Sequence, residues 1–238
     1  MMGRGLFITG TDTGVGKTLV TAMILVGLQE AGLRVAAMKP VETGCAVRGG
    51  RLVPADAEYL RTVGRLAEPP GAMAPYTFAL PAAPWAAARE ARVEIVLDRI
   101  AEAYAALASR ADCVLVEGAG GLLVPLADGV QFPEVARRLG TPVVIVARSG
   151  LGTLNHTQLT VREATRAGLE VLGIVLNDGR AAADAAVEAN LALLDALVGV
   201  PILGRIPPLA GRPPARETLA AAARAHIQLE RLCAAVGV

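Results

Sequence analysis

The residues with the clearest chemistry in this sequence form a short glycine-rich run that contains Gly14, Val15, Gly16, Lys17 and Thr18. Glycines let successive backbone N–H groups converge on a polyphosphate, a lysine adds a point charge, and a threonine hydroxyl can bind Mg²⁺. The usual loop reads G-x-x-x-x-G-K-[ST], whereas here the first glycine comes one residue early, at Gly10, and Thr11 holds the expected position. An ordinary glycine-rich turn is the alternative. However, G-K-T that follows an apolar strand and opens a helix is typical of a nucleoside triphosphate site.

Lysine is almost absent from the rest of the chain. The sequence has 23 basic residues, and all except Lys17 and Lys39 are arginine. Arginine cannot replace lysine where a compact, strongly hydrated charge must fit. The lysine retained at position 39 is therefore a second candidate for chemistry, with codon bias as the competing explanation.

Two carboxylates complete the candidate set. Glu117 closes the apolar run 112–116 and leads into GAGG, which resembles the Mg²⁺-associated acidic position of phosphate-binding-loop enzymes. A solvated acid at a turn is the alternative. Asp56 lies near the start of an expected helix, so that it is either a helix-capping residue or a functional carboxylate.

Alternating strands and helices must position these residues. Apolar runs of strand length occur at 6–8, 33–38, 112–116, 141–150, 168–178 and 201–207. Helices are expected at 18–31 with Gly32 at the end, at 56–63, 93–109 and 155–167, and after Pro214 to about 236. Residues 47–54 are expected to be flexible, and residues 64–85 to make a long surface excursion. This alternation predicts an α/β protein, P-loop NTPase-like, with a mostly parallel sheet and helices on both faces.

The unusual polar positions share one end of the predicted sheet. Each of them follows a strand: Gly10, Lys39, Glu117, the loop 148–155, Asn177 and Pro207. Open α/β sheets bind their ligands in a crevice at the carboxyl ends of the strands. One crevice could therefore hold all of these positions.

Composition limits the other possibilities. The chain has 238 residues and is 53% hydrophobic, which suits one α/β domain over residues 1–238. Its net charge of +1 gives no positive electrostatic field that would attract nucleic acid or an anionic membrane. The chain opens directly into a strand and its apolar runs are short, so that we expect a cytoplasmic protein. Three scattered cysteines and two histidines indicate neither a disulfide framework nor a zinc site, and the expected metal is Mg²⁺ held by oxygen.

The motifs together resemble one family. In chain order between residues 5 and 209 they are GTDTGVGKT, KPVETG, PADA, APYTFALPAAP, VEGAGGLLVPL, GLGTLNHT, GIVLND and PILGRIP. This set is similar to the dethiobiotin synthetases of biotin biosynthesis. The resemblance implies a homodimer that binds ATP and Mg²⁺ in each subunit, with the substrate near the subunit interface.

The resemblance also implies a reaction. CO₂ adds to an amine of 7,8-diaminononanoate (diaminopelargonic acid), and the carbamate attacks the γ-phosphorus of ATP to give a carbamic–phosphoric anhydride. The second amine then closes the ring, so that a ligase produces dethiobiotin, ADP and phosphate.

The resemblance assigns roles to matching residues. Lys39 and Lys17 are the implied catalytic residues, with Lys39 bridging carbamate and γ-phosphate. Thr18, Asp56 and Glu117 are the implied Mg²⁺ ligands, and Thr43 and Asn155 the implied substrate contacts, the latter from the partner subunit. Asn177 is implied to read adenine. The implied nucleotide-binding residues are Gly14, Val15, Gly16, Lys17, Thr18, Leu19, Asp56, Glu117, Gly118, Ala119, Gly120, Asn177, Asp178, Pro207, Pro208 and Leu209.

Three alternatives stay open at the level of sequence. An ATPase switch resembling MinD and ParA would share the deviant loop, but such proteins carry a second lysine where this chain has Asp12. Another ATP-dependent synthase, resembling the cobyrinic acid amidating enzymes, would need a glutaminase domain. A nucleotide-binding module without catalytic activity is the third alternative.

Overall fold

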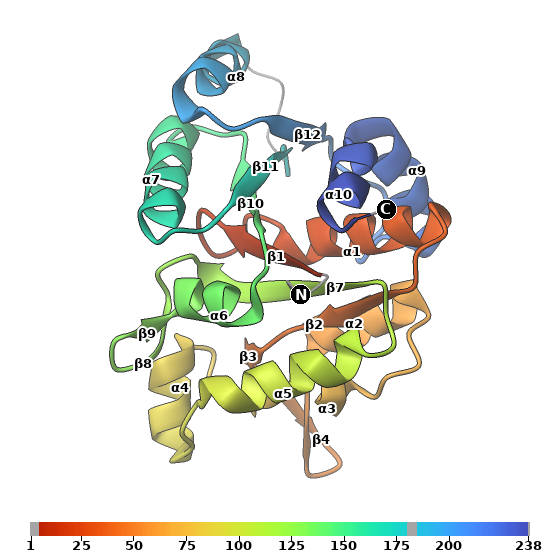
Figure 1. Ribbon diagram of the computed structural model, residues 1–238, viewed down its shortest axis with the longest axis vertical. Coiled ribbons are helices and arrows are strands. Elements are labelled where there is room, and N and C mark those ends of the chain that lie inside the picture. Colours follow the sequence, from red (N-terminus) through yellow and green to blue (C-terminus); the bar gives the residue numbers. More distant parts are fainter. Residues whose placement is uncertain (1–4, 180–184, 238) are drawn as a thin grey trace.

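A six-stranded parallel sheet forms the centre of the computed structural model, which describes residues 5–179 and 185–237 (Figure 1). Of the predicted domain 1–238, residues 1–4, 180–184 and 238 lie outside the described residues. The strand order is β12-β11-β10-β1-β7-β2. The strands are β1 (Gly5–Gly10), β2 (Val35–Met38), β7 (Cys113–Gly121), β10 (Val143–Arg148), β11 (Val171–Asn177) and β12 (Ile202–Ile206). All pairings in this sheet are parallel, which confirms the predicted fold class.

Helices cover both faces of this sheet (Figure 1). Leu6 and Ile8 of β1 face the core beneath α1 (Lys17–Glu30), α2 (Ala55–Gly64), α9 (Arg216–His226) and α10 (Leu229–Ala235). Phe7 faces the opposite core, beneath α4 (Pro84–Ala91), α5 (Leu97–Ala108), α6 (Phe132–Leu139), α7 (Thr153–Arg166) and α8 (Ala185–Val198). Because side chains alternate along a strand, a run of apolar residues supplies both cores at once.

Helix α1 is apolar around most of its circumference because it is enclosed on several sides. It packs on the sheet, on α2 and on α9, and its residues from Val20 to Leu28 are all buried. The predicted helix end is close to the observed one. Glu30 is the last residue of the helix and Ala31 is its C-cap, and Gly32 follows with a φ of 93°, the left-handed conformation that glycine adopts without strain.

The segments between the second and third predicted strands are more ordered than the sequence indicated. The segment 47–54 mostly forms a hairpin of β4 (Ala46–Arg48) and β5 (Arg51–Val53), whose turn residues Gly49 and Gly50 both have positive φ. The predicted excursion 64–85 contains α3 (Pro70–Met73) and β6 (Tyr76–Phe78). Strand β6 pairs in parallel with β3 (Val41–Thr43), which fixes this segment beside the chain that directly follows Lys39.

Other differences arise from long-range pairing. The prediction that Glu117 closes its strand is wrong, because β7 continues beside β1 to Gly121. The closing helix is broken between α9 and α10, where Ile227 bridges to Gly204 of β12. Helices α6 and α8 and the hairpin β8 (Pro125–Ala127) and β9 (Val130–Gln131) were not predicted. No helix of the described chain is long and apolar enough to cross a bilayer.

Candidate active site

The loop between β1 and α1 has the geometry of an anion-binding turn. Gly14 and Gly16 have φ values of 74° and 97°, which a residue with a Cβ rarely adopts. A Cβ on Gly16 would lie 2.1 Å from Nδ2 of Asn177. Gly16 is also the N-cap of α1 and makes no side-chain cap hydrogen bond. The first N–H groups of α1 are therefore available to an anion at the positive end of the helix dipole.

A cavity of about 310 Å³ opens beside this loop. Many of the predicted site residues line it: Gly14, Gly16, Lys17, Thr18, Lys39, Thr43, Asp56, Glu117, Ala119 and Gly120. A wider cavity of about 470 Å³ lies between α3 and α5, and none of the predicted site residues lines it. Chemistry rather than size therefore identifies the candidate site.

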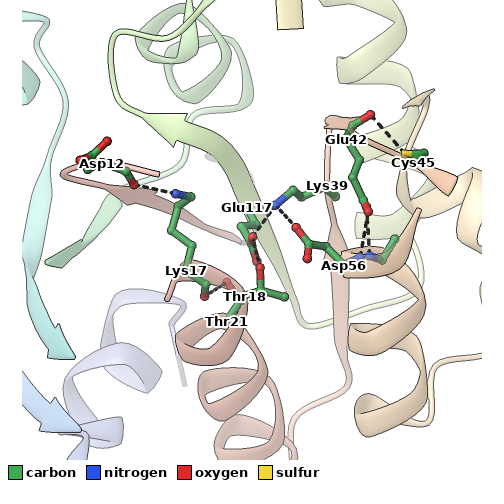
Figure 2. A network of polar contacts seen from close by, with 10 residues as sticks. Asp12, Lys17, Thr18, Thr21, Lys39, Glu42, Cys45, Asp56 and Glu117 are labelled. Atoms are coloured by element: carbon green, nitrogen blue, oxygen red, sulfur yellow. Dashed lines mark hydrogen bonds and ion pairs between the residues drawn. The ribbon is translucent and has the colours of Figure 1, made fainter. Parts of the chain in front are cut away.

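Lys39 lies at the centre of a carboxylate cluster (Figure 2). Its Nζ donates to Oδ2 of Asp56 at 2.6 Å and to Oε1 of Glu117 at 2.5 Å, and the Thr18 hydroxyl donates to the same Glu117 oxygen at 2.7 Å. Lys39 is 4% exposed and Glu117 is 0% exposed. Burial by itself would lower the pKa of Lys39, but the charges of Glu117 and Asp56 outweigh it and hold this pKa above its usual value. Lys39 is therefore a cation at neutral pH.

Lys17 has a different environment on the same cavity. Its Nζ donates to the backbone oxygen of Asp12 at 3.0 Å (Figure 2). Burial, followed by repulsion from Lys39, lowers the pKa of Lys17 to about 8, although Glu117 and Asp56 partly oppose the shift. An anion bound at the loop would supply the negative partner that the Lys17 ammonium lacks here.

The structure places the predicted adenine residues outside the cavity lining. The Asn177 amide donates to the backbone oxygen of Val15 at 2.9 Å and so holds the glycine-rich loop between β1 and α1. Asp178 accepts two hydrogen bonds from Nε of Arg205, at 2.8 and 3.0 Å, and one from Ser149. The remaining predicted residues also lie outside the lining: Val15, Leu19, Gly118, Asn155, Pro207, Pro208 and Leu209. Of these, Asn155 is exposed on α7.

Glu42 is a residue of the site that the sequence did not indicate. It lies on β3, lines the cavity, and is 5% exposed. Its carboxylate accepts the backbone N–H of Asp56 at 2.8 Å and of Ala57 at 3.2 Å. Burial raises the pKa of Glu42, and the N–H hydrogen bonds partly offset the shift. The available signal was an acidic residue between Lys39 and Thr43, opposite a helix that begins after Pro54.

These contacts also decide between the two interpretations of Asp56. The N-cap of α2 is Pro54, which makes no side-chain cap hydrogen bond. Glu42 provides the cap from another element, and the Asp56 side chain instead contacts Lys39. The capping interpretation of Asp56 is therefore wrong.

Oxygen atoms dominate the polar lining near Lys39. Oε2 of Glu117 is buried and accepts no hydrogen bond from the described residues, so that it can bind a further cation or donor. Within residues 5–179 and 185–237, no three His, Cys, Asp or Glu side chains gather as a metal site by themselves. A cation here would need the Thr18 hydroxyl and oxygens from a ligand as well, which is the usual situation for Mg²⁺.

A parallel sheet, a glycine-rich loop at the start of α1 and a buried lysine–carboxylate cluster define an α/β protein of the P-loop nucleotide-binding class. Two solved structures share the fold. A ParA family ATPase from Chlorobium tepidum has a TM-score of 0.53 at 16% identity, covering 97% of this chain and 92% of that one. MinD from Pyrococcus horikoshii, complexed with Mg-ADP, has a TM-score of 0.52 at 24% identity, covering 92% and 86%. At these identities the likeness concerns the fold alone.

Sequence relatives identify the family within this class. A family model described as an AAA domain matches residues 4–215. The ATP-dependent dethiobiotin synthetase BioD of Anaeromyxobacter dehalogenans strain 2CP-C is 51% identical over 189 residues, which are 79% of this chain and 83% of that protein. The protein of the same name from Bacillus subtilis strain 168 is 34% identical over 236 residues, 99% and 100% of the two chains. The chain belongs to the ATP-dependent dethiobiotin synthetase family.

Proposed function

We propose that this chain uses Mg·ATP to carboxylate and cyclise 7,8-diaminononanoate with CO₂, forming dethiobiotin, ADP and phosphate. Family membership supports the overall reaction. The observation that carries the proposed mechanism is the buried Lys39 ammonium, held 2.5 Å from Glu117 in the cavity that also contains the phosphate-binding loop. This arrangement supports a role for Lys39 as a cation beside the transferred phosphoryl group.

The phosphates of ATP would bind at the start of α1. Lys17 and Thr18 both line the cavity, and the N-cap Gly16 makes no side-chain cap hydrogen bond. Charge on the β- and γ-phosphates would favour the protonated form of Lys17 and so reverse the effect of its burial. The adenine would extend toward Asn177 and the segment 207–209, at the carboxyl ends of β11 and β12.

Thr18, Asp56 and Glu117 fit a Mg²⁺ ion. They offer a hydroxyl and two carboxylates, and Oε2 of Glu117 is free of hydrogen bonds from the described residues. Mg²⁺ is usually held by one or two carboxylates together with substrate phosphates and water. When bound, the ion would neutralise charge on the phosphates of ATP. The chain's own task is to hold these three oxygens in place.

Lys39 would hold the carbamate and the γ-phosphate together. The first amine attacks CO₂ and loses a proton, which forms a carbamate. The carbamate oxygen then attacks phosphorus and ADP leaves. Since a carbamate is a poor electrophile, this phosphorylation converts its oxygen into a leaving group. The second amine attacks the carbonyl carbon within the same molecule, loses a proton and expels phosphate. The Lys39 cation would offset the negative charge of the transferring group throughout.

We further propose a homodimer with the substrate near its interface. Leu123, Leu151 and Leu159 are exposed, Leu151 to 87%, and Leu123 and Leu159 line a cavity of about 330 Å³ that also contains Thr13 of the phosphate-binding loop. Exposed apolar side chains around a cavity favour burial against another surface. Thr43 would hydrogen-bond the substrate, and Asn155, exposed on α7, would contact it from the second subunit. Sedimentation of the wild type and of Leu151→Glu would test the dimer. We expect a dimeric wild type and a weakened dimer in the variant, and a monomeric wild type would contradict the proposal.

Phosphate release by the purified protein tests the reaction directly. The protein is given Mg·ATP and bicarbonate, with and without 7,8-diaminononanoate, and the product mass is followed. We expect phosphate release only with the diamine, together with an equal amount of cyclic urea product. ATP hydrolysis at the same rate with and without the diamine would contradict the proposal and favour an ATPase switch of the MinD and ParA type. Cytoplasmic localisation stays a prediction of the sequence.

A further inference from the structure

We propose that Glu42 is a positioning residue, which holds Asp56 against Lys39 by anchoring the first turn of α2 to β3. The inference rests on the proposed function for its catalytic consequence, but its structural part concerns the free protein. The contacts are the two hydrogen bonds from the N–H groups of Asp56 and Ala57 to the Glu42 carboxylate (Figure 2).

One short segment holds Asp56 at two points. Lys39 and Glu42 are three residues apart and lie on either side of the start of β3. Lys39 binds the Asp56 carboxylate at 2.6 Å, and Glu42 binds the Asp56 backbone at 2.8 Å. The first contact depends on where the helix turn lies, because Asp56 projects from that turn. The second contact sets the position of the turn.

The rest of α2 is fixed from another direction. Leu60 and Val63 are buried in the core beneath the helix, Tyr59 donates to the backbone oxygen of Pro214, and Arg216 donates to the backbone oxygen of Val63. These contacts hold the middle and the C-terminal half of the helix. At the other end, nearest the active site, Glu42 anchors the backbone of the helix and Lys39 binds the side chain of Asp56.

A helix cap alone would not need this arrangement. A serine or aspartate at position 54 could cap the same N–H groups locally, whereas a carboxylate that is 5% exposed has lost most of its hydration. Glu42 also lies near the negative charge of Asp56, which makes its burial less favourable. A local cap would satisfy these N–H groups without the two disadvantages. Unlike a local cap, however, Glu42 links α2 to the segment that carries Lys39.

The two lysines allow this link to be observed directly. Protein labelled with ¹⁵N-lysine carries side-chain labels at Lys17 and Lys39 and nowhere else. We expect Glu42→Ala to move the Lys39 ammonium resonance toward its position in Asp56→Ala and to leave the Lys17 resonance in place. Glu58→Gln, which changes a partly exposed carboxylate on the same helix that pairs with Arg61, is the matched control and should move neither. An unchanged Lys39 resonance in Glu42→Ala would overturn the proposal.

Kinetics separate positioning from helix stability. We expect Glu42→Ala to lower kcat by about 10- to 100-fold, the range that misplacement of an active-site group can produce, and Glu42→Gln to retain more activity because its amide oxygen can still accept one N–H. Adding Pro54→Ser to Glu42→Ala supplies a local cap, so that Tm should recover while kcat stays low. Recovery of kcat together with Tm would overturn the positioning role. If the wild type makes no dethiobiotin, the proposed function fails, while the resonance experiment still tests the link.

Discussion

Lys17 and Lys39 line the same cavity and are both buried, yet their surroundings have opposite effects on them. Lys17 contacts an uncharged backbone oxygen, and burial lowers its pKa to about 8. Lys39 contacts two carboxylates, which hold its pKa above its usual value despite deeper burial. Burial by itself therefore does not fix the charge of a lysine. The partners within hydrogen-bonding distance determine it.

The difference suits the two parts of the proposed reaction. The region around Lys17 lacks a bound negative charge until a polyphosphate supplies one, so that ligand binding and the charge of Lys17 support each other. The region around Lys39 is already balanced, so that its ammonium is held in position before any ligand arrives. A preorganised charge of this kind is the main electrostatic device available for phosphoryl transfer.

Replacing each lysine should produce the largest contrast. Lys39→Met leaves Glu117 buried without its partner, and we expect it to lower the free energy of unfolding by about 3–5 kcal/mol. Lys17→Met removes a cation that burial disfavours, and we expect little loss of stability but weak ATP binding. Denaturant unfolding and nucleotide titration measure both effects. Equal stability losses in the two variants would contradict the comparison.

Lys39→Arg sharpens the same comparison because it keeps the charge. We expect the fold and much of the ATP binding to survive, while kcat for ring closure falls by about 10²- to 10³-fold, as for loss of one preorganised catalytic contact. The planar guanidinium cannot occupy the compact position between Asp56 and Glu117. Normal turnover by Lys39→Arg would remove the assigned role of Lys39.

Glu117→Gln tests the carboxylate side of the cluster. The amide keeps the size of the side chain but removes the negative charge of the carboxylate to which Lys39 and Thr18 donate. We expect the Mg²⁺ concentration for half-maximal activity to rise by about 10- to 100-fold, as for other losses around metal sites. Unchanged metal dependence would exclude Glu117 as a ligand, and Glu58→Gln is the control.

The two lysines should also differ in their reaction with an amine-acylating reagent. The neutral amine is the reactive form, and the neutral fraction of Lys17 rises as pH rises through about 8. Lys39 stays protonated over this range because its pKa is raised. We expect acylation of Lys17, measured by peptide mass spectrometry between pH 7 and about 9, to exceed that of Lys39. Equal rates would show that the environments do not differ as described.

Asn177→Ala should have the smallest effect. The variant loses the hydrogen bond from the Asn177 amide to the backbone oxygen of Val15, which costs about 1 kcal/mol of stability. The phosphate-binding loop also loses one support, so that the KM for ATP should rise several-fold while the Lys39 cluster is unaffected. A large fall in kcat with an unchanged KM would contradict this division.

Much of the sheet could be predicted because its strands are apolar on both faces. The run from Leu6 to Ile8 and the run from Val143 to Ala147 are continuous apolar segments, and each contributes to both cores. The order of the strands and the continuation of β7 past Glu117 could not be predicted, since they depend on pairing with strands far away in the sequence. The pairing of β3 with β6 likewise depends on residues that lie 35 apart.

The sequence by itself determined the family and indicated the glycine-rich loop and Lys39 as candidate site residues, because these depend on residue types at short spacings. Only the tertiary structure decided which charges meet. Lys39, Asp56 and Glu117 belong to three segments, and their contacts span 17 and 78 residues. Glu42 gained its role in the same way, since the helix it caps begins 13 residues later, at Ala55. Hydrogen bonds form only within a few ångströms and charge pairs are strongest there, and the fold alone determines which residues come that close.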